Sequence, residues 1–228
     1  MIYVRNIFFY ITFYIWTIIF FITFSPVKFF TKKFALHLSK IWTGMVILLT
    51  EQILGISYEI SGKRIRLRDK SILIASNHQS PWETFFFVVF FDNPVFILKK
   101  ELKIIPIMSW YFEKLDFIFI DRTKKLNSIK HIINSAKQIM KNENKTFIIF
   151  PEGTRILPGK KVALNSGVFA IHKMLSLPVF PLKHNSGLFW KNKRFLKYPG
   201  KIKVSIFPQI KSKKKDSFLK KIEKYFYN

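Results

Sequence analysis

The sequence predicts an α/β fold, with a sheet covered by helices on both faces, preceded by a pair of membrane-associated helices. From about residue 58 onward, short apolar runs alternate with longer segments that have one polar face. Continuous apolar runs are typical of strands buried on both sides, as in sheets whose crossovers are helices. Before residue 58, two longer apolar stretches carry almost no charge. We therefore expect N-terminal membrane-associated helices in residues 1–57 and an α/β domain with a basic tail in residues 58–228.

The first apolar stretch, Asn6–Val27, contains 22 residues without a formal charge. As a helix it would be about 33 Å long, enough to cross the hydrocarbon core of a bilayer. A signal peptide fits poorly, because the run is long and no cleavage site of small residues follows it. The stretch therefore predicts attachment to a membrane.

The second apolar stretch, Ile41–Ile56, carries a single charge on Glu51. It is short for a membrane span and favours an amphipathic helix at the interface. Ser25-Pro26 and the basic segment 28–33 join it to the first stretch, so the two are expected to form a helical hairpin. The pattern leaves two alternatives open: the hairpin crosses the bilayer, or it is embedded in one leaflet.

The elements of the α/β part follow in order along the chain. Six short apolar runs are predicted strands: 71–76, 95–98, 117–120, 146–150, 178–182 and 202–207. Three segments with a polar face are predicted helices: 81–91, 127–142 and 166–175. The basic tail, 211–224, is a further candidate helix with weak amphipathic character. A chain of 228 residues suits one well-filled domain and hardly two.

The charge balance limits the classes of partner. Lys and Arg number 39 against 13 Asp and Glu, which gives a formal net charge of +26. Because 49% of the residues are hydrophobic, the chain is not a disordered polycation. A nucleic-acid-binding protein has no use for the apolar N-terminal run, so we expect membrane lipids as partners and no nucleic acid. The absence of cysteine excludes a disulfide framework, a thiolate metal site and a cysteine nucleophile.

The first candidate catalytic segment, Asn77–Glu83, directly follows the predicted strand 71–76. His78 is therefore expected at the carboxyl end of a strand, where open α/β sheets place their sites. Ser80, Pro81 and Glu83 have the spacing of a helix start with a capping box. Glu83 can thus be a helix cap, or it can bond one ring nitrogen of His78 and leave the other free as a general base.

The second candidate segment, Phe150–Arg155, directly follows the predicted strand 146–150. Gly153 permits a close approach of the backbone, Thr154 offers a hydroxyl, and Arg155 offers a planar guanidinium suited to phosphate. Glu152 is expected to orient the basic groups or the loop rather than to touch the substrate. This segment predicts a site for an anion.

A third strand end supplies another cation. Arg122 follows the predicted strand 117–120. If the strand ends meet at one edge of the sheet, His78, Arg122 and Arg155 form a base beside two phosphate-binding cations. The sequence lacks the Gly-x-Ser-x-Gly motif of serine nucleophiles, the His-Glu-x-x-His motif of metal sites and the Gly-x-Gly-x-x-Gly motif of dinucleotide sites. We therefore expect neither a metal nor a nucleotide cofactor. The remaining histidines are expected to be structural or solvated: His37, His131, His172 and His184.

Taken in order, four blocks of the sequence resemble the membrane glycerolipid acyltransferases, in particular the 1-acyl-sn-glycerol-3-phosphate acyltransferase group. The blocks are Asn77–Glu83, Phe119–Arg122, Phe150–Arg155 with its intact Phe-Pro-Glu-Gly-Thr-Arg, and Val179–Pro181 followed by His184-Asn185-Ser186-Gly187. The similarity covers roughly residues 70–210, and the ordered set is far more specific than any single block. Two departures are Glu83, where many members carry Asp, and Asn165-Ser166-Gly167, where members often carry a Lys before the Gly.

The resemblance implies a mixed, mostly parallel sheet and a membrane-bound enzyme that needs no cofactor. The expected donor is acyl-CoA or acyl-carrier protein, and the expected acceptor is lysophosphatidic acid. His78, oriented by Glu83, would be the general base, and the substrate-binding residues would be Arg122, Glu152, Gly153, Thr154 and Arg155. Another lysolipid acceptor, such as a lyso-ornithine lipid, and a non-catalytic lipid-binding protein remain the alternatives.

The composition, rich in Lys, Ile, Asn and Phe, indicates an AT-rich bacterial genome. A bacterial source would place the protein at the inner membrane. The catalytic domain would then lie in the cytoplasm, where donor thioesters are made.

Overall fold

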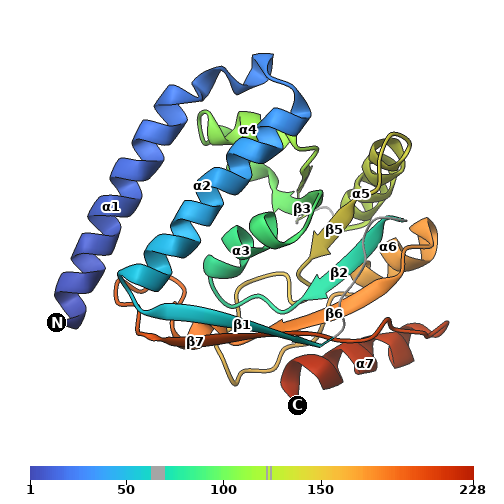
Figure 1. Cartoon of the computed structure of the whole chain (residues 1–228). Helices are drawn as coiled ribbons and strands as arrows, with labels where there is room; N and C mark the ends of the chain where they lie inside the picture. Colours follow the sequence, from blue (N-terminus) through green and yellow to red (C-terminus); the bar gives the residue numbers. More distant parts are fainter. Residues whose placement is uncertain (63–69, 122, 124) are drawn as a thin grey trace.

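The sheet has seven strands in the order β1-β7-β6-β2-β5-β3-β4 in the computed structural model, which describes residues 1–62, 70–121, 123 and 125–228 (Figure 1). Five of the six strand pairs are parallel and the pair β6–β7 is antiparallel, which confirms the mixed, mostly parallel sheet. The strands are β1 (Ile56–Gly62), β2 (Ile72–Ser76), β3 (Pro94–Lys99), β4 (Ile118–Ile120), β5 (Thr146–Ile149), β6 (Val179–His184) and β7 (Gly200–Ile206).

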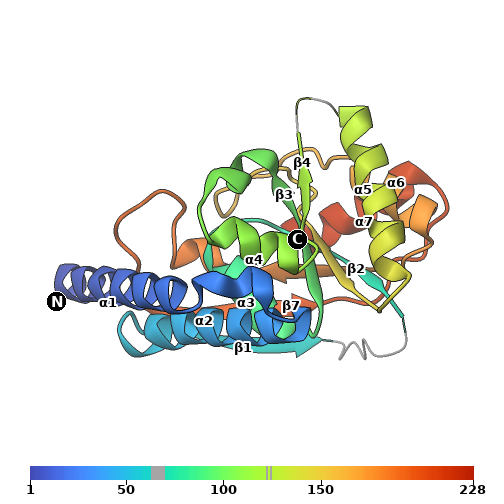
Figure 2. The same cartoon turned by 90° about the horizontal axis from the view of Figure 1, so that it is seen from above.

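Helices cover both faces of this sheet (Figures 1 and 2). One face carries α1 (Ile2–Thr23), α2 (Lys32–Gln52), α3 (Trp82–Phe90) and α4 (Met108–Lys114), and the other carries α5 (Lys125–Met140), α6 (Gly167–Leu175) and α7 (Lys215–Tyr227). Three short 3₁₀ helices complete the described elements: η1 (Ser25–Phe29), η2 (Lys100–Ile104) and η3 (Ser186–Leu188). In β2, Ile72 and Ile74 pack on the first face while Leu73 and Ala75 pack on the second, because successive side chains of a strand point in opposite directions.

All six strands and three helices predicted for residues 71–207 are present, with small shifts of their ends. The candidate helix 211–224 is α7. The limits predicted for the second N-terminal helix, 41–56, are wrong. It begins at Lys32, because the Thr31 hydroxyl caps it by accepting from Phe34 N at 3.2 Å, and it ends at Gln52, since Gly55 at φ 69° turns the chain into β1. The sequence reasoning missed β1 and the short α4.

The predicted helical hairpin is formed by α1 and α2, which lie side by side (Figures 1 and 2). Trp16 Nε1 donates to the carbonyl of Trp42, and Trp42 Nε1 donates to Thr17 Oγ1, each at 3.3 Å. Near the start of α1, Asn6 Nδ2 donates to the carbonyl of Lys197 at 3.0 Å, and Lys197 N donates to Asn6 Oδ1 at 2.8 Å. The hairpin is therefore tied to the loop that precedes β7.

A cluster of four charged residues fixes the start of α2 to the domain. Lys32 pairs with both Asp116 and Glu143, and the buried Lys145 ammonium lies 2.8 Å from Glu143. Asp116 follows α4, and the other two partners precede β5. Breaking such a cluster would leave a buried charge without a partner, so it holds α2 in one position.

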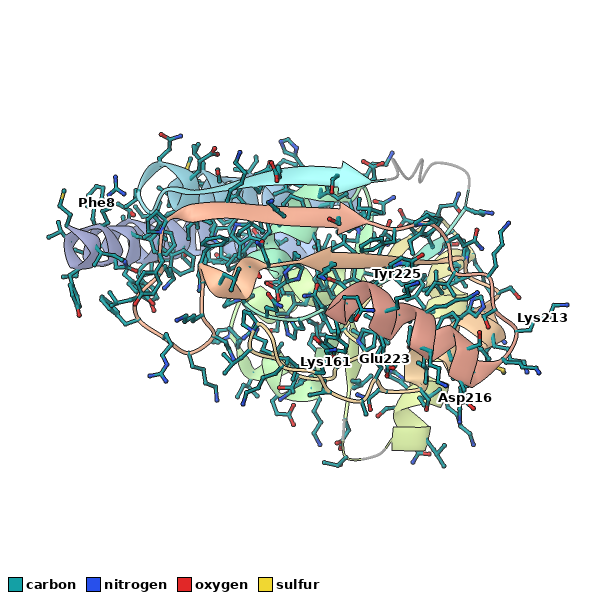
Figure 3. The ribbon with its side chains drawn as sticks, turned by 90° about the horizontal axis from the view of Figure 1, so that it is seen from below. Phe8, Lys161, Lys213, Asp216, Glu223 and Tyr225 are labelled. Atoms are coloured by element: carbon teal, nitrogen blue, oxygen red, sulfur yellow. The ribbon has the colours of Figure 1, made fainter. Side chains whose placement is uncertain are left out.

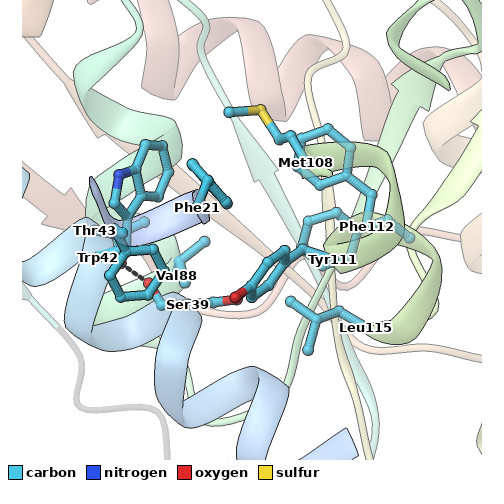
Figure 4. Close-up of a pocket in the computed structure, with 11 residues that line it drawn as sticks. Phe21, Ser39, Trp42, Thr43, Val88, Met108, Tyr111, Phe112 and Leu115 are labelled. Atoms are coloured by element: carbon cyan, nitrogen blue, oxygen red, sulfur yellow. Dashed lines mark hydrogen bonds between the residues drawn. The ribbon is translucent and has the colours of Figure 1, made fainter. Parts of the chain in front are cut away.

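A small apolar cavity of about 50 Å³ lies where the hairpin meets the domain (Figure 4). The hydroxyls of Ser39 and Thr43 at its wall donate to backbone carbonyls of α2 at 2.9 and 2.7 Å. Its lining residues come from α1, α2, α3, α4 and the segment between α4 and β4: Phe20, Phe21, Ser39, Trp42, Thr43, Val88, Met108, Tyr111, Phe112, Leu115 and Phe117. The hairpin thus contacts the domain through apolar side chains.

The opposite side of α1 carries a stripe of exposed apolar side chains along its whole length. With mean hydropathy 1.8 and a most apolar segment only 17% buried, α1 is the one helix among the described residues long and apolar enough to cross a membrane. The stripe has helical spacing and consists of Val4, Ile7, Phe8, Ile11, Tyr14, Ile15, Ile18, Ile19 and Ile22. An exposed apolar face of this size fits association with a membrane.

Candidate active site

The turn between β2 and α3 brings the first sequence motif to the carboxyl edge of the sheet. Asn77 fixes the turn to the neighbouring strand β6: its Nδ2 donates to the carbonyl of His184, and His184 N donates to Asn77 Oδ1, both at 2.9 Å. The side-chain amide thus imitates a pair of sheet hydrogen bonds beyond the end of β2. This holds His78 at the edge where the sequence placed it.

His78 and Glu83 form a hydrogen-bonded pair. His78 Nδ1 lies 2.8 Å from Glu83 Oε1, and the His78 side chain is 13% exposed while that of Glu83 is fully buried. The ring of Phe150 stacks on the imidazole with 4.0 Å between centroids. The other ring nitrogen, Nε2, makes no hydrogen bond to any described residue. It is therefore available to exchange a proton with a ligand.

Glu83 fills both of the roles that its position in the sequence allows. Its Oε1 accepts from the backbone N–H groups of Gln79 and Ser80 at 2.8 Å, which is the arm of a capping box. Its Oε2 accepts from Ser80 Oγ at 2.6 Å and from Ser186 Oγ at 2.9 Å. The helix cap thus positions the same carboxylate that orients His78.

The Glu83 carboxylate is ionised in spite of its complete burial. Burial by itself opposes the charge, but attraction from the imidazoles of His184 and His78 and hydrogen bonds from His78 and Ser80 outweigh it. They hold the pKa of Glu83 well below its usual value. A fixed negative charge beside Nδ1 favours the tautomer of His78 that carries its proton on that nitrogen and leaves Nε2 free.

Two residues of this site, His184 and Ser186, were not assigned a role from the sequence. His184 is buried, and its Nε2 donates to the carbonyl of Asn77 at 2.9 Å, so its Nδ1 is the acceptor for Ser186 N, 3.4 Å away. Burial lowers the pKa of His184. The signal that could have found them is the strand end: His184 is the last residue of β6, which pairs with β2, and Ser186 follows two residues later.

Glu152 contacts the turn that carries His78 rather than a cation. Its Oε2 accepts from His78 N at 2.6 Å, and its Oε1 accepts from the Tyr227 hydroxyl at 3.1 Å. Burial raises the pKa of Glu152 to about 7. Of the two functions expected for this residue, its contacts are those of a group that orients the loop.

The loop after β5 places a guanidinium beside the turn. Ile156 N donates to the carbonyl of His78 at 2.7 Å, which keeps Arg155 next to His78. Arg155 Nη1 donates to Asn192 Oδ1 at 3.3 Å, while its buried Nε has no hydrogen-bond partner among the described residues. Burial lowers the pKa of Arg155. The described residues therefore leave the buried Nε–H of this cation without an acceptor.

Gly153 and Thr154 occupy the same loop. Gly153 has φ 73°, and a Cβ there would come within 2.7 Å of Asn165 Nδ2, so a side chain does not fit. Thr154 is exposed. Arg122 lies outside the described residues, and β4, which precedes it, is separated from β5 by β3. The proximity of Arg122 to Arg155 remains a prediction from the sequence.

The arrangement supplies a buried carboxylate, an oriented imidazole with one available nitrogen, and a neighbouring guanidinium. This set suits the removal of a proton from a hydroxyl group close to an anion. Within the described ranges, no three His, Asp or Glu side chains are grouped to hold a metal ion.

Comparison with known proteins identifies the family. The family model described as Acyltransferase matches residues 57–185, which contain the first three sequence blocks and all of the fourth except Ser186 and Gly187. A 1-acyl-sn-glycerol-3-phosphate acyltransferase of Pseudomonas aeruginosa is 34% identical over 210 residues, covering 90% of this chain and 80% of that protein. The 1-acyl-sn-glycerol-3-phosphate acyltransferase alpha of Mus musculus is 25% identical over 169 residues, covering 73% of this chain and 59% of that protein.

A solved structure agrees with the fold. The crystal structure of the 1-acyl-sn-glycerophosphate acyltransferase PlsC from Thermotoga maritima matches all of this chain and 95% of that one, with a TM-score of 0.81 at 22% sequence identity. The likeness confirms the predicted fold. Because the family model covers more than half of the chain and the Pseudomonas relative is 34% identical along most of it, the chain belongs to the acyltransferase family, as its four ordered motifs predicted.

Proposed function

We propose that this acyltransferase moves a fatty acyl group from a thioester donor to the free hydroxyl of 1-acyl-sn-glycerol 3-phosphate, producing phosphatidic acid. The donor is acyl-CoA or acyl-carrier protein. The observation that carries the proposal is the pairing of His78 with the ionised Glu83 beside Arg155, whose Nε lacks a partner. The names of the Pseudomonas and mouse relatives support the choice of acceptor.

In the proposed reaction, His78 Nε2 takes the proton of the acceptor hydroxyl as its oxygen attacks the thioester carbonyl. Glu83 stabilises the resulting imidazolium through the 2.8 Å contact with Nδ1. The tetrahedral intermediate then collapses, the C–S bond breaks, and the leaving thiolate receives the proton from His78. Since the chain has no cysteine and no Gly-x-Ser-x-Gly motif, the acyl group passes directly to the acceptor.

Arg155 is the proposed contact for the phosphate of the acceptor. Its hydrogen bond to Asn192 is with a neutral group, and no carboxylate of the described residues forms an ion pair with it. A phosphate oxygen would satisfy the buried Nε and compensate the charge. Gly153 and Thr154 of the same loop, and Arg122 by its place in the sequence, complete the proposed phosphate site. Glu152 orients the turn that carries His78.

The test uses purified protein, an acyl thioester and a panel of acceptors, with thiol release and labelled lipid product as readouts. His78→Ala is expected to lower turnover by about 10²–10⁴-fold. Arg155→Ala is expected to raise KM for lysophosphatidic acid by about 10- to 150-fold, with little change for the donor. Arg155→Lys should recover only part of the loss, because lysine keeps the charge but not the planar fork.

Monoacylglycerol is the control acceptor, because it lacks the phosphate. Its slower reaction should be nearly indifferent to both Arg155 variants. Equal losses on the two acceptors would refute the phosphate site. Faster transfer to a lyso-ornithine lipid would reassign the acceptor. Lipid binding without thiol release would refute the enzymatic proposal.

We also propose that the hairpin is embedded in one leaflet of the bacterial inner membrane, with the catalytic domain on the cytoplasmic side. The stripe on α1 supports contact with lipid. A span is disfavoured because α2 packs against the domain, as in the 5.5 Å contact between the rings of Trp42 and Phe85 on α3. Since α1 lies along α2 and is tied to Lys197 at its start, both of its ends stay near the domain.

Single cysteines test this topology cleanly, because the chain has none of its own. Tyr3→Cys marks the start of α1, Phe29→Cys marks the turn before α2, and Lys213→Cys marks the domain; all three positions are exposed. A membrane-impermeant maleimide should label all three from the cytoplasmic side of sealed vesicles. Labelling of positions 3 and 29 from opposite sides would show that α1 spans the membrane.

A further inference from the structure

The helix α7 reaches the catalytic turn from the opposite face of the sheet. Figure 3 shows it lying below the sheet, with Tyr225 and Glu223 on its last turns and Lys161 nearby. Its buried residues Phe218, Ile222 and Phe226 repeat every four positions and pack in the core of that face. This packing fixes the end of the helix, and Tyr227 follows directly.

The Tyr227 hydroxyl touches the active site through Glu152. It donates to Glu152 Oε1 at 3.1 Å, and the other oxygen of the same carboxylate accepts from His78 N at 2.6 Å. The hydroxyl also lies 3.3 Å from the carbonyl of Val162 and accepts from Val162 N at 3.4 Å. One side chain therefore connects α7, the loop after β5 and the turn that carries His78.

We propose that Tyr227 is a positioning residue for acyl transfer: its hydroxyl holds the Glu152 carboxylate that in turn fixes the backbone of His78. This inference rests on the proposed function. It extends that function to a helix that lies outside the four motifs and beyond the residues matched by the family model.

The charges around Glu152 explain why the hydrogen bond from Tyr227 matters for the ionisation of this carboxylate. The carboxylate is buried, the ionised Glu83 lies near it, and no cationic side chain of the described residues forms an ion pair with it. Burial and Glu83 both oppose its ionisation, whereas the hydrogen bonds from His78 N and Tyr227 favour it. The other charged groups nearby are Arg155 on its own loop and, around Tyr227, Lys161, Lys220, Glu223 and Lys224.

Loss of the Tyr227 hydroxyl would favour the protonated form of Glu152. A hydrogen bond that favours the ionised form of Glu152 disappears, so the pKa of Glu152, already raised to about 7, rises further. At neutral pH the residue then becomes protonated, and a neutral acid accepts more weakly from His78 N. The turn that carries His78 loosens, which lowers the rate of the chemical step without removing a substrate contact.

The first experiment compares Tyr227→Phe with Tyr225→Phe in the full-length protein. Tyr225 is a matched control, because it lies on the same helix, stacks on Phe207 at 4.3 Å, and its hydroxyl bonds to no described residue. Tyr227→Phe is expected to lower kcat by about 5- to 20-fold at pH 7 and to leave KM for both substrates unchanged. For Tyr227→Phe, the acid limb of the plot of kcat against pH should move to higher pH. The plot for Tyr225→Phe should match that of the wild type.

A double-mutant cycle with Glu152→Gln separates positioning from simple support. Glutamine cannot ionise, so adding Tyr227→Phe to Glu152→Gln should cause no further loss and no shift of the acid limb. The limb is compared only over the pH range in which thermal unfolding shows every variant to be folded, so partial unfolding cannot imitate the effect.

Three results would overturn the inference. These are equal activity of the two phenylalanine variants, a loss by Tyr227→Phe of the same factor at every pH, and losses that multiply in the cycle. A wild-type protein without acyl transfer would instead refute the proposed function.

Discussion

Replacement of Glu83 by Gln tests the electrostatic role of the buried carboxylate with little change of shape. The amide oxygen can take the place of Oε1 and still accept from His78 Nδ1 and from Gln79 N and Ser80 N. The amide NH₂ then takes the place of Oε2, where the hydroxyls of Ser80 and Ser186 can rotate to accept instead of donate. The variant should therefore fold, keep the tautomer of His78 and lose the charge.

The expected loss of kcat follows from the attraction between the Glu83 carboxylate and the His78 imidazolium that forms during the reaction. Two unit charges about 4 Å apart attract by about 4 kcal/mol at an effective dielectric constant of about 20. This energy corresponds to about a thousandfold in rate. Because the amide oxygen keeps part of the interaction, we expect kcat to fall by about 10²–10³-fold. His78→Ala, which removes the base itself, should lose more.

The assay measures thiol release and labelled product under saturating donor and acceptor, together with thermal unfolding in detergent. Glu101→Gln is the matched control, since it makes the same change of carboxylate to amide at an exposed position of η2. It should leave kcat unchanged. A folded Glu83→Gln protein with nearly normal kcat would refute the reasoning, because the negative charge would then contribute nothing to the imidazolium.

Two further predictions concern the groups around this pair. Ser186→Ala removes a donor from Glu83 Oε2 and should lower kcat by about 5- to 30-fold. The control is Ser217→Ala at an exposed position of α7, which should leave kcat unchanged. Equal activity of the two variants would show that the hydrogen bond from Ser186 does not contribute to turnover. The pKa of Glu152 is raised to about 7 from an ordinary value of 4.5. The folded protein therefore binds the proton more tightly, and this residue's contribution to stability falls as pH rises from about 4.5 to 7, by at most about 1.4 kcal/mol per pH unit. Glu152→Gln should flatten that part of the curve of unfolding free energy against pH, measured by chemical denaturation, and an unchanged slope would contradict this assignment.

The family and the α/β fold followed from local features of the sequence. Runs such as 71–76 and 146–150 are apolar on both sides, which restricts them to buried strands, and each is followed by a chemically distinctive turn. His78 and Glu83 could be paired from the sequence because both belong to one strand-to-helix turn, whose geometry is short-range. Ser80 and Glu83 have capping-box spacing, so even the cap that positions the carboxylate was visible.

Other features depended on contacts between distant segments. Ser186 and His184 reach Glu83 only because β6 pairs with β2, and Tyr227 reaches Glu152 only because α7 packs across the sheet. The strand β1 escaped prediction because its residues are mostly exposed and it pairs with β7, about 140 residues later in the chain.

The sequence by itself determined most of the strands and helices and the family, because periodicity, capping and motif spacing act over a few residues. It offered the pairing of His78 with Glu83 as one of two alternatives. Only the tertiary structure decided which distant residues support the pair of His78 and Glu83. The stripe on α1 and the contacts of α2 show the same division: the apolar composition was evident, but which side is buried depends on the packing of the hairpin. Burial and hydrogen bonding between remote segments are properties of the folded chain, and no local pattern encodes them.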